Sequence, residues 1–177
     1  MELNSSRQKV LQRAHHMQTN DDDRKAVRLP IASLHKHWIT ADAVKARMHL
    51  EIKAPEGMPP QLVAEAQKWS QVQTMAVFYG LFYVVIEGYG ELGLKDEAID
   101  ALLGANDYEA RLRRFRNAVF HYQEDPFDKR LIEFLDAKDS EHWGKALYEA
   151  FEKFFEKVLP IREIVERLSS QQVEDKA

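Results

Sequence analysis

The sequence contains no cysteine. Disulfides, thiolate zinc sites and cysteine nucleophiles are therefore excluded together, and the composition fits a reducing compartment such as the cytoplasm. The N-terminus also lacks an apolar stretch followed by a small-residue cleavage site, so it does not have the pattern of a secretion signal. We expect a cytoplasmic protein.

Long apolar runs are also missing. The longest, MAVFYGLFYVVI over residues 75–86, is well short of the roughly 20 residues of a membrane span. It is flanked by glutamines and by Glu87. We therefore expect this run in a protein core or at an interface with a second copy, and no membrane partner.

Internal repeats and low-complexity linkers are absent too, and 177 residues suit one compact domain. Residues 1–30 are predicted to be an N-terminal arm, in which RQKVLQRAHHM can form a short helix. Residues 31–170 are predicted to be the single helical domain. The charged residues 171–177 are predicted to be a disordered tail.

Apolar residues recur at three- and four-residue spacing, which predicts an all-α bundle of five to six helices. The first helix is expected to begin at Ser33 and to end before the proline-rich loop 53–60. A long apolar helix is predicted from Pro60 to about residue 90, at the centre of the bundle. A short helix over residues 96–103 should end at Gly104.

Three more helices complete this prediction. Asn106 and Glu109 have the spacing of a capping box, and the helix they open should run through RLRRFRNAVFHYQ to Asp125. The next helix follows Asp128. The last begins at residue 139 or 140 and continues beyond Pro160, which should kink it.

Positive charge is concentrated in and just after the predicted helix that contains RLRRFRNAVFHYQ. The chain has a net charge of −4, yet residues 111–130 carry six Lys or Arg against three Asp or Glu. The overall charge argues against a protein that coats nucleic acid, whereas a local basic patch is typical of an anion site. Arg111, Arg113 and Arg114 are candidate contacts to an RNA backbone.

Within the patch, Arg116, Asn117 and His121 form a candidate phosphate site. Residues four apart share one line of a helix, so Asn117 and His121 should touch, while the long Arg116 side chain could reach the imidazole or a shared ligand. Histidine can move the proton of a 2′-hydroxyl, and arginine can stabilise a charged phosphate. This set could cleave RNA without a metal. The alternative is an ordinary solvated arginine-rich helix.

The run Arg116-Asn117-Ala118-Val119-Phe120-His121 resembles the signature of the HEPN superfamily, and the order of helices over residues 33–168 is similar as well. The resemblance implies a helical bundle that commonly forms homodimers, with motifs of both chains lining one cleft. It also implies, in many members, a metal-independent endoribonuclease of toxin–antitoxin or antiphage systems, with Arg116 and His121 as the catalytic pair and Asn117 in support. Other members are non-catalytic.

One position departs from a subgroup of this superfamily. Members paired with nucleotidyltransferase antitoxins usually have a tyrosine two residues after the histidine, where this chain has Gln123 and places Tyr122 one residue early. Tyr122 and Glu87 are expected beside the site as supporting residues. For Glu87 we favour a pair with an arginine of the motif helix over a solvated position at the helix end.

No metal or other cofactor is expected. The histidine groups at residues 15–16, 35–37 and 49 lack the three- or four-residue spacing of helical metal ligands, and DDD at 21–23 lacks the spaced oxygens of a calcium loop. We therefore expect an endoribonuclease with RNA or a nucleotide as ligand, a second copy of the chain as partner, and an antitoxin protein as a further one. A non-catalytic module that binds a nucleotide, RNA or protein, and a subunit that docks an acidic partner, are the alternatives.

Overall fold

A computed structural model describes residues 29–125 and 128–161, and in these ranges the chain forms six helices and no strand. The predicted all-α bundle is thus confirmed. By its contacts the chain divides into two units after residue 33, and apart from the start of the first helix the structure is described for residues 34–125 and 128–161. The predictions for residues 1–28, including their histidine pair and acidic run, and for the tail lie outside the described residues.

The longest helix is α2, Pro60–Glu91, which begins and ends where the sequence predicts. Proline is tolerated at its first position because that residue's N–H would have no partner within the helix. Its buried residues all lie in the second half, between Phe78 and Tyr89. The apolar run therefore lies in the core, as expected.

By length and composition alone, α2 is also the one helix in the described ranges that could cross a membrane. Its most apolar window has a mean hydropathy of 1.2, and 39% of that window is buried inside the protein. Core helices of soluble proteins have the same length and composition, so the feature by itself is weak support for a span.

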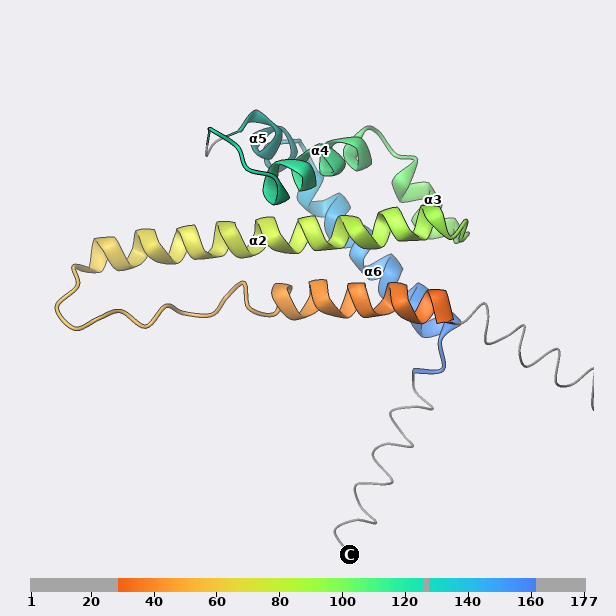
Figure 1. The fold of residues 1–177 in the computed structure, drawn as a ribbon, viewed down its shortest axis with the longest axis horizontal. Coiled ribbons are helices and arrows are strands. Elements are labelled where there is room, and N and C mark those ends of the chain that lie inside the picture. The colour runs from red at the N-terminus through yellow and green to blue at the C-terminus, as the bar shows by residue number, and fades with distance from the viewer. Residues whose placement is uncertain (1–28, 126–127, 162–177) are drawn as a thin grey trace, which may run out of the picture. The chain divides into compact units, whose positions relative to one another are not determined.

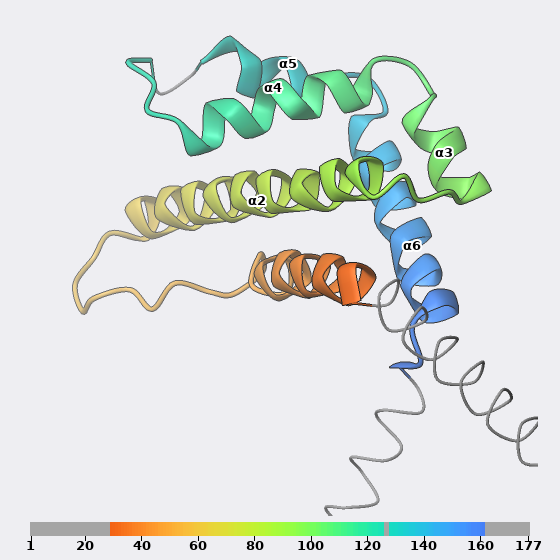
Figure 2. The same cartoon turned by 45° about the vertical axis from the view of Figure 1, so that its right-hand side comes forward.

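The remaining helices pack around α2. Two helices, α4 (Tyr108–Phe120) and α5 (Lys129–Leu135), lie on one side of α2, and residues 34–45 lie on the other (Figure 1). Figure 2 shows the same order from another direction, with α6 (Ser140–Val158) crossing α2. The short α3 (Glu97–Leu103) packs on α6.

Aromatic rings fill the space where α2, α4, α5 and α6 meet. Phe82 of α2 lies edge-on to Phe151 of α6, with 5.8 Å between ring centroids, and both are fully buried. Phe115 of α4 packs on Phe134 of α5 at 5.1 Å. These contacts bury one face of α4 and leave its arginines on the other faces.

The first helix differs from its prediction at both ends. It already includes residues 29–32, with Pro30 inside it, and it ends at residue 45. The turn that follows carries Met48 out of the helix, and the Gln67 side chain of α2 then binds the backbone of Leu50 and Ile52 at 2.9 and 2.8 Å. An amide on α2 therefore competes with a further helical turn.

Two other predicted helix ends are wrong. Asn106 adopts a left-handed conformation (φ 57°) instead of capping α4, and the N-cap residue is Asp107, whose side chain makes no cap hydrogen bond. The last helix is not merely kinked at Pro160, because α6 ends at Val158 and Leu159 is extended. The ring of a proline disfavours the helical conformation of the residue before it, which here is Leu159.

Candidate functional site

The motif helix α4 ends one residue before His121. Phe120 is its last residue, and His121 has extended backbone angles (φ −115°, ψ 143°). The backbone N–H of His121 still donates to the Asn117 carbonyl at 3.2 Å. The prediction that the helix continues to Asp125 is wrong, and so is the placing of the Asn117 and His121 side chains on one helical line.

Arg116 is held by two neighbours. Its Nη1 donates to Asn117 Oδ1 at 3.0 Å, and its Nη2 lies 3.4 Å from Glu87 Oε2 on α2. The Arg116 side chain is 29% exposed and that of Glu87 is 41% exposed. The pairing predicted for Glu87 is therefore present, although Glu87 lies at the surface and not in the core.

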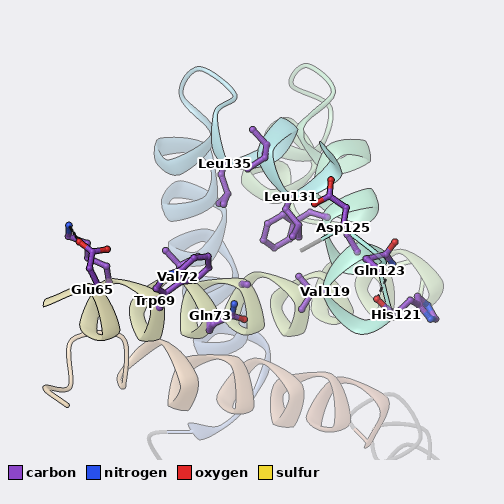
Figure 3. A pocket seen from close by; sticks show the side chains of 15 residues that line it. Glu65, Trp69, Val72, Gln73, Val119, His121, Gln123, Asp125, Leu131 and Leu135 are labelled. Carbon is purple, nitrogen blue, oxygen red and sulfur yellow. Dashed lines mark hydrogen bonds and ion pairs between the residues drawn. The ribbon is translucent and has the colours of Figure 1, made fainter. Parts of the chain in front are cut away.

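His121 is exposed and stands apart from this pair. Its imidazole points away from the other labelled side chains of the adjoining cavity (Figure 3). Within the described residues, neither a hydrogen bond nor an ion pair joins the side chains of Arg116 and His121. In the described ranges the structure thus joins Arg116, Asn117 and Glu87 through their side chains, whereas His121 binds Asn117 only through the backbone.

Three arginines of α4 were predicted to contact an RNA backbone, and two of them already have acidic partners within the protein. Arg111 Nε donates to both carboxylate oxygens of Asp107 at 2.9 Å, and this hydrogen bond lowers the pKa of Asp107. Arg114 lies 3.8 Å from Glu133 of α5. Arg113 is exposed, and no ion pair involving its guanidinium is found in the described ranges.

Sequence reasoning missed Tyr83 and gave Glu109 only a capping role. The Tyr83 hydroxyl donates to Glu109 Oε1 at 3.4 Å, and the Arg116 guanidinium lies 6.0 Å from the centroid of the Tyr83 ring. Burial raises the pKa of Tyr83 to about 12, helped by the charges of Glu109 and Glu87 and opposed by Arg113. Tyr83 lies one helical turn before Glu87, and that spacing is the signal that could have identified it.

The two residues that follow His121 behave differently from each other. Tyr122 is 89% exposed, so its side chain does not join the apolar face of α4, and a supporting role for it beside the site stays a prediction. Gln123 instead donates to the His121 carbonyl at 2.9 Å and accepts a hydrogen bond from Arg130 of α5. Sequence alone marked Gln123 only as a departure from a superfamily subgroup.

A cavity of about 620 Å³ opens between α2, α4 and α5, with His121 and Gln123 at its edge (Figure 3). Its walls are mostly apolar and include Trp69, Val72, Val119, Leu131 and Ile132. Arg116 is not among its lining residues, because Phe115, Ala118 and Val119 turn a different face of α4 toward it. The cavity and the Arg116 group are therefore separate features of α4.

No group of three or more His, Asp or Glu side chains that could hold a metal ion occurs in residues 29–125 and 128–161. His35 stacks on Trp38 with 5.7 Å between the ring centroids, and burial lowers the pKa of His35. The His35 side chain thus belongs to the packing of the first helix.

No protein-family model, no curated protein and no solved structure matches the chain.

Proposed function

We propose that this chain is a HEPN-like endoribonuclease that cleaves RNA without a metal and works as a homodimer in the cytoplasm, as a toxin or antiphage component restrained by an antitoxin protein. The observation that carries the proposal is the placement of the motif: Arg116 is oriented by Asn117 and Glu87, and the exposed His121 follows it at the end of the same helix. An oriented guanidinium and an accessible imidazole are the two groups that the reaction needs.

The reaction is a transesterification. A neutral His121 imidazole accepts the 2′-hydroxyl proton, the 2′-oxygen bonds to phosphorus, and the bond from phosphorus to the 5′-oxygen breaks. A second, protonated imidazole gives its proton to the leaving 5′-oxygen. Arg116 binds the phosphate and stabilises the charge that grows on its oxygens. The products carry a 2′,3′-cyclic phosphate and a 5′-hydroxyl.

The need of the reaction for two imidazoles supports the homodimer. One imidazole cannot be both base and acid in the same step, so a second copy supplies the other. Phe120, next to His121, is an apolar residue that is 47% exposed, and Val77 of α2 is 36% exposed. Both suit contact with a second copy.

The test is RNA cleavage by the purified protein in EDTA, with analysis of the ends. We expect cyclic-phosphate ends from the wild type and a loss of at least about a hundredfold in His121→Ala. His142→Ala, at an exposed histidine of α6, is the matched control and should keep full activity. No cleavage by the wild type, or full activity in His121→Ala, would overturn the proposal.

The second candidate is a non-catalytic module of the same type that binds RNA through Arg116. The observation that favours it is the Arg116–Glu87 ion pair, which already occupies the guanidinium while His121 stays apart. In that case the wild type shows no turnover, yet Arg116→Ala weakens RNA binding and His121→Ala does not.

A further inference from the structure

The segment that follows the motif helix is held by one glutamine. The Nε2 of Gln123 donates to the backbone carbonyl of His121 at 2.9 Å, and its Oε1 accepts a hydrogen bond from Nη2 of Arg130. Both ends of this amide are thus engaged. Because each end has a different partner, the amide has one preferred orientation, with its donor toward His121.

Arg130 is in turn fixed by Asp128. Its Nε and Nη2 donate to the two carboxylate oxygens of Asp128, both at 2.8 Å, and the Asp128 carboxylate also accepts the Arg130 backbone N–H at 2.9 Å. The hydrogen bond from Arg130 lowers the pKa of Asp128 to about 2, so this carboxylate is charged at neutral pH. A two-pronged pair of this kind gives the guanidinium a defined direction.

Asp128 is the N-cap residue of α5, and α5 packs against α4 and α6 through the buried Phe134. The hydrogen bonds therefore run from a packed helix to the His121 backbone, through Arg130 and Gln123. On its other side, the His121 N–H is bonded to Asn117 at 3.2 Å. Both backbone polar groups of His121 are thus held in an extended conformation.

We propose that Gln123 is a positioning residue, which directs the His121 imidazole by fixing the carbonyl of the same residue. This rests on the proposed function, in which that imidazole exchanges a proton with RNA. The direction in which a side chain leaves the backbone depends on the orientation of the two peptide groups that flank it. Gln123 holds one of these peptide groups and the end of α4 holds the other.

Gln123→Met and Gln123→Glu test this role. Methionine keeps the length of the side chain and loses both hydrogen bonds, whereas glutamate can still accept from Arg130 but cannot donate to the His121 carbonyl. Gln73→Met is the matched control, because Gln73 is an exposed glutamine that lines the same cavity and has no side-chain hydrogen bond in the described ranges. Thermal unfolding identifies any variant that fails to fold.

The first measurement uses the protein without RNA. In both Gln123 variants the imidazole C–H resonances of His121 should shift, and so should the backbone N–H resonance of Tyr122, whose peptide group contains the His121 carbonyl that loses its hydrogen bond. Gln73→Met should leave both signals unchanged. Unchanged His121 signals in Gln123→Met would overturn the proposal, because this variant loses the donor to His121 and adds no charge.

The second measurement is catalytic. We expect kcat to fall about tenfold in both Gln123 variants with little change in KM, because a misdirected base affects the reaction more than RNA binding. Equal kcat values for Gln123→Met and Gln73→Met would overturn the positioning role and leave the nuclease proposal intact. If the wild type cleaves no RNA but the His121 resonances shift in the variants, the structural role stands and the proposed function fails.

Discussion

The carboxylate of Glu87 on α2 lies 3.4 Å from the guanidinium of Arg116 on α4. The pair joins two helices and places a negative charge where a phosphate that uses Arg116 would have to approach. Both side chains are partly exposed, so the attraction is screened by water and a stronger anion can replace it. Glu87 therefore orients Arg116, and it would compete with a phosphate that binds there.

Glu87→Gln should consequently tighten RNA binding. The variant keeps the size of the side chain and removes the competing charge, so we expect the Kd for single-stranded RNA to fall about two- to fivefold, in keeping with the loss of one exposed ion pair. The salt dependence of binding should steepen by about one counterion, since one more guanidinium becomes available to phosphate. Titration at several salt concentrations measures both effects.

Glu91→Gln is the control for that experiment. Glu91 is an exposed acid one turn further along α2, and it takes part in no ion pair within the described ranges. The Glu91→Gln variant changes the net charge of the protein by the same amount as Glu87→Gln. Equal tightening by the two variants would mean that net charge, and not the contact with Arg116, limits RNA binding.

Much of the fold could be predicted because apolar spacing and helix-ending residues act locally. The bounds of α2, the Asp128 start of α5 and the end of α3 at Gly104 follow from residues next to the helix ends. The end of α4 could not be predicted, because no glycine or proline stands between Phe120 and Asp125. The contacts of this segment come from α2, far away in the sequence, and from Arg130 of α5, on the other side of the loop that follows α4.

The candidate site was predicted only in part for the same reason. The Arg116–Glu87 pair was expected because a buried Glu87 would need a partner; the pair is present, but Glu87 is 41% exposed, so burial is not its cause. The position of His121 depended on the assumption that the helix continued. The Gln123–Arg130–Asp128 hydrogen bonds connect the loop after α4 with the start of α5 and do not lie within one helix, so no helical pattern indicated them.

Gly80 provides a test of the contact that fixes the end of α4. A Cβ atom added at Gly80 would lie 2.6 Å from the ring of Phe120, the last residue of the helix. Gly80→Ala should therefore destabilise the protein by about 1–2 kcal/mol relative to Gly90→Ala, through overpacking against this ring. At Gly90 an added Cβ meets nothing within 4 Å in the described structure, and alanine should stabilise the helix by about 0.5–1 kcal/mol. Urea unfolding of both variants measures the difference, and equal gains in stability would contradict the contact.

The caps of α3 and α4 provide a second comparison. The Asp96 side chain accepts hydrogen bonds from the backbone N–H groups of Ala98 and Ile99 at 3.1 and 3.3 Å. Asp96→Ala should cost about 1 kcal/mol of unfolding free energy, as for other N-caps. Asp107→Ala should cost less, because the Asp107 carboxylate binds only the exposed Arg111 and caps no backbone group. Denaturant unfolding measures both losses, and a larger loss in Asp107→Ala than in Asp96→Ala would contradict this account.

His35 should make stability depend on pH. Its ring lies 4.9 Å from that of Phe155 and is stacked on Trp38, and burial lowers its pKa below the ordinary 6.5. The unfolded chain then binds a proton more readily than the folded protein does. The contribution of His35 to stability is accordingly complete above pH 6.5 and is lost as the pH falls through the lower pKa of the folded state.

Urea unfolding at pH 7.5 and pH 5.5 measures this contribution. His35→Phe keeps an aromatic ring and cannot be protonated, so its unfolding free energy should fall less between the two pH values than that of the wild type. The same substitution at the exposed His142 should retain the full fall. If His35→Phe lost as much stability as the wild type on acidification, the burial of the His35 ring would not be what makes the folded protein sensitive to acid.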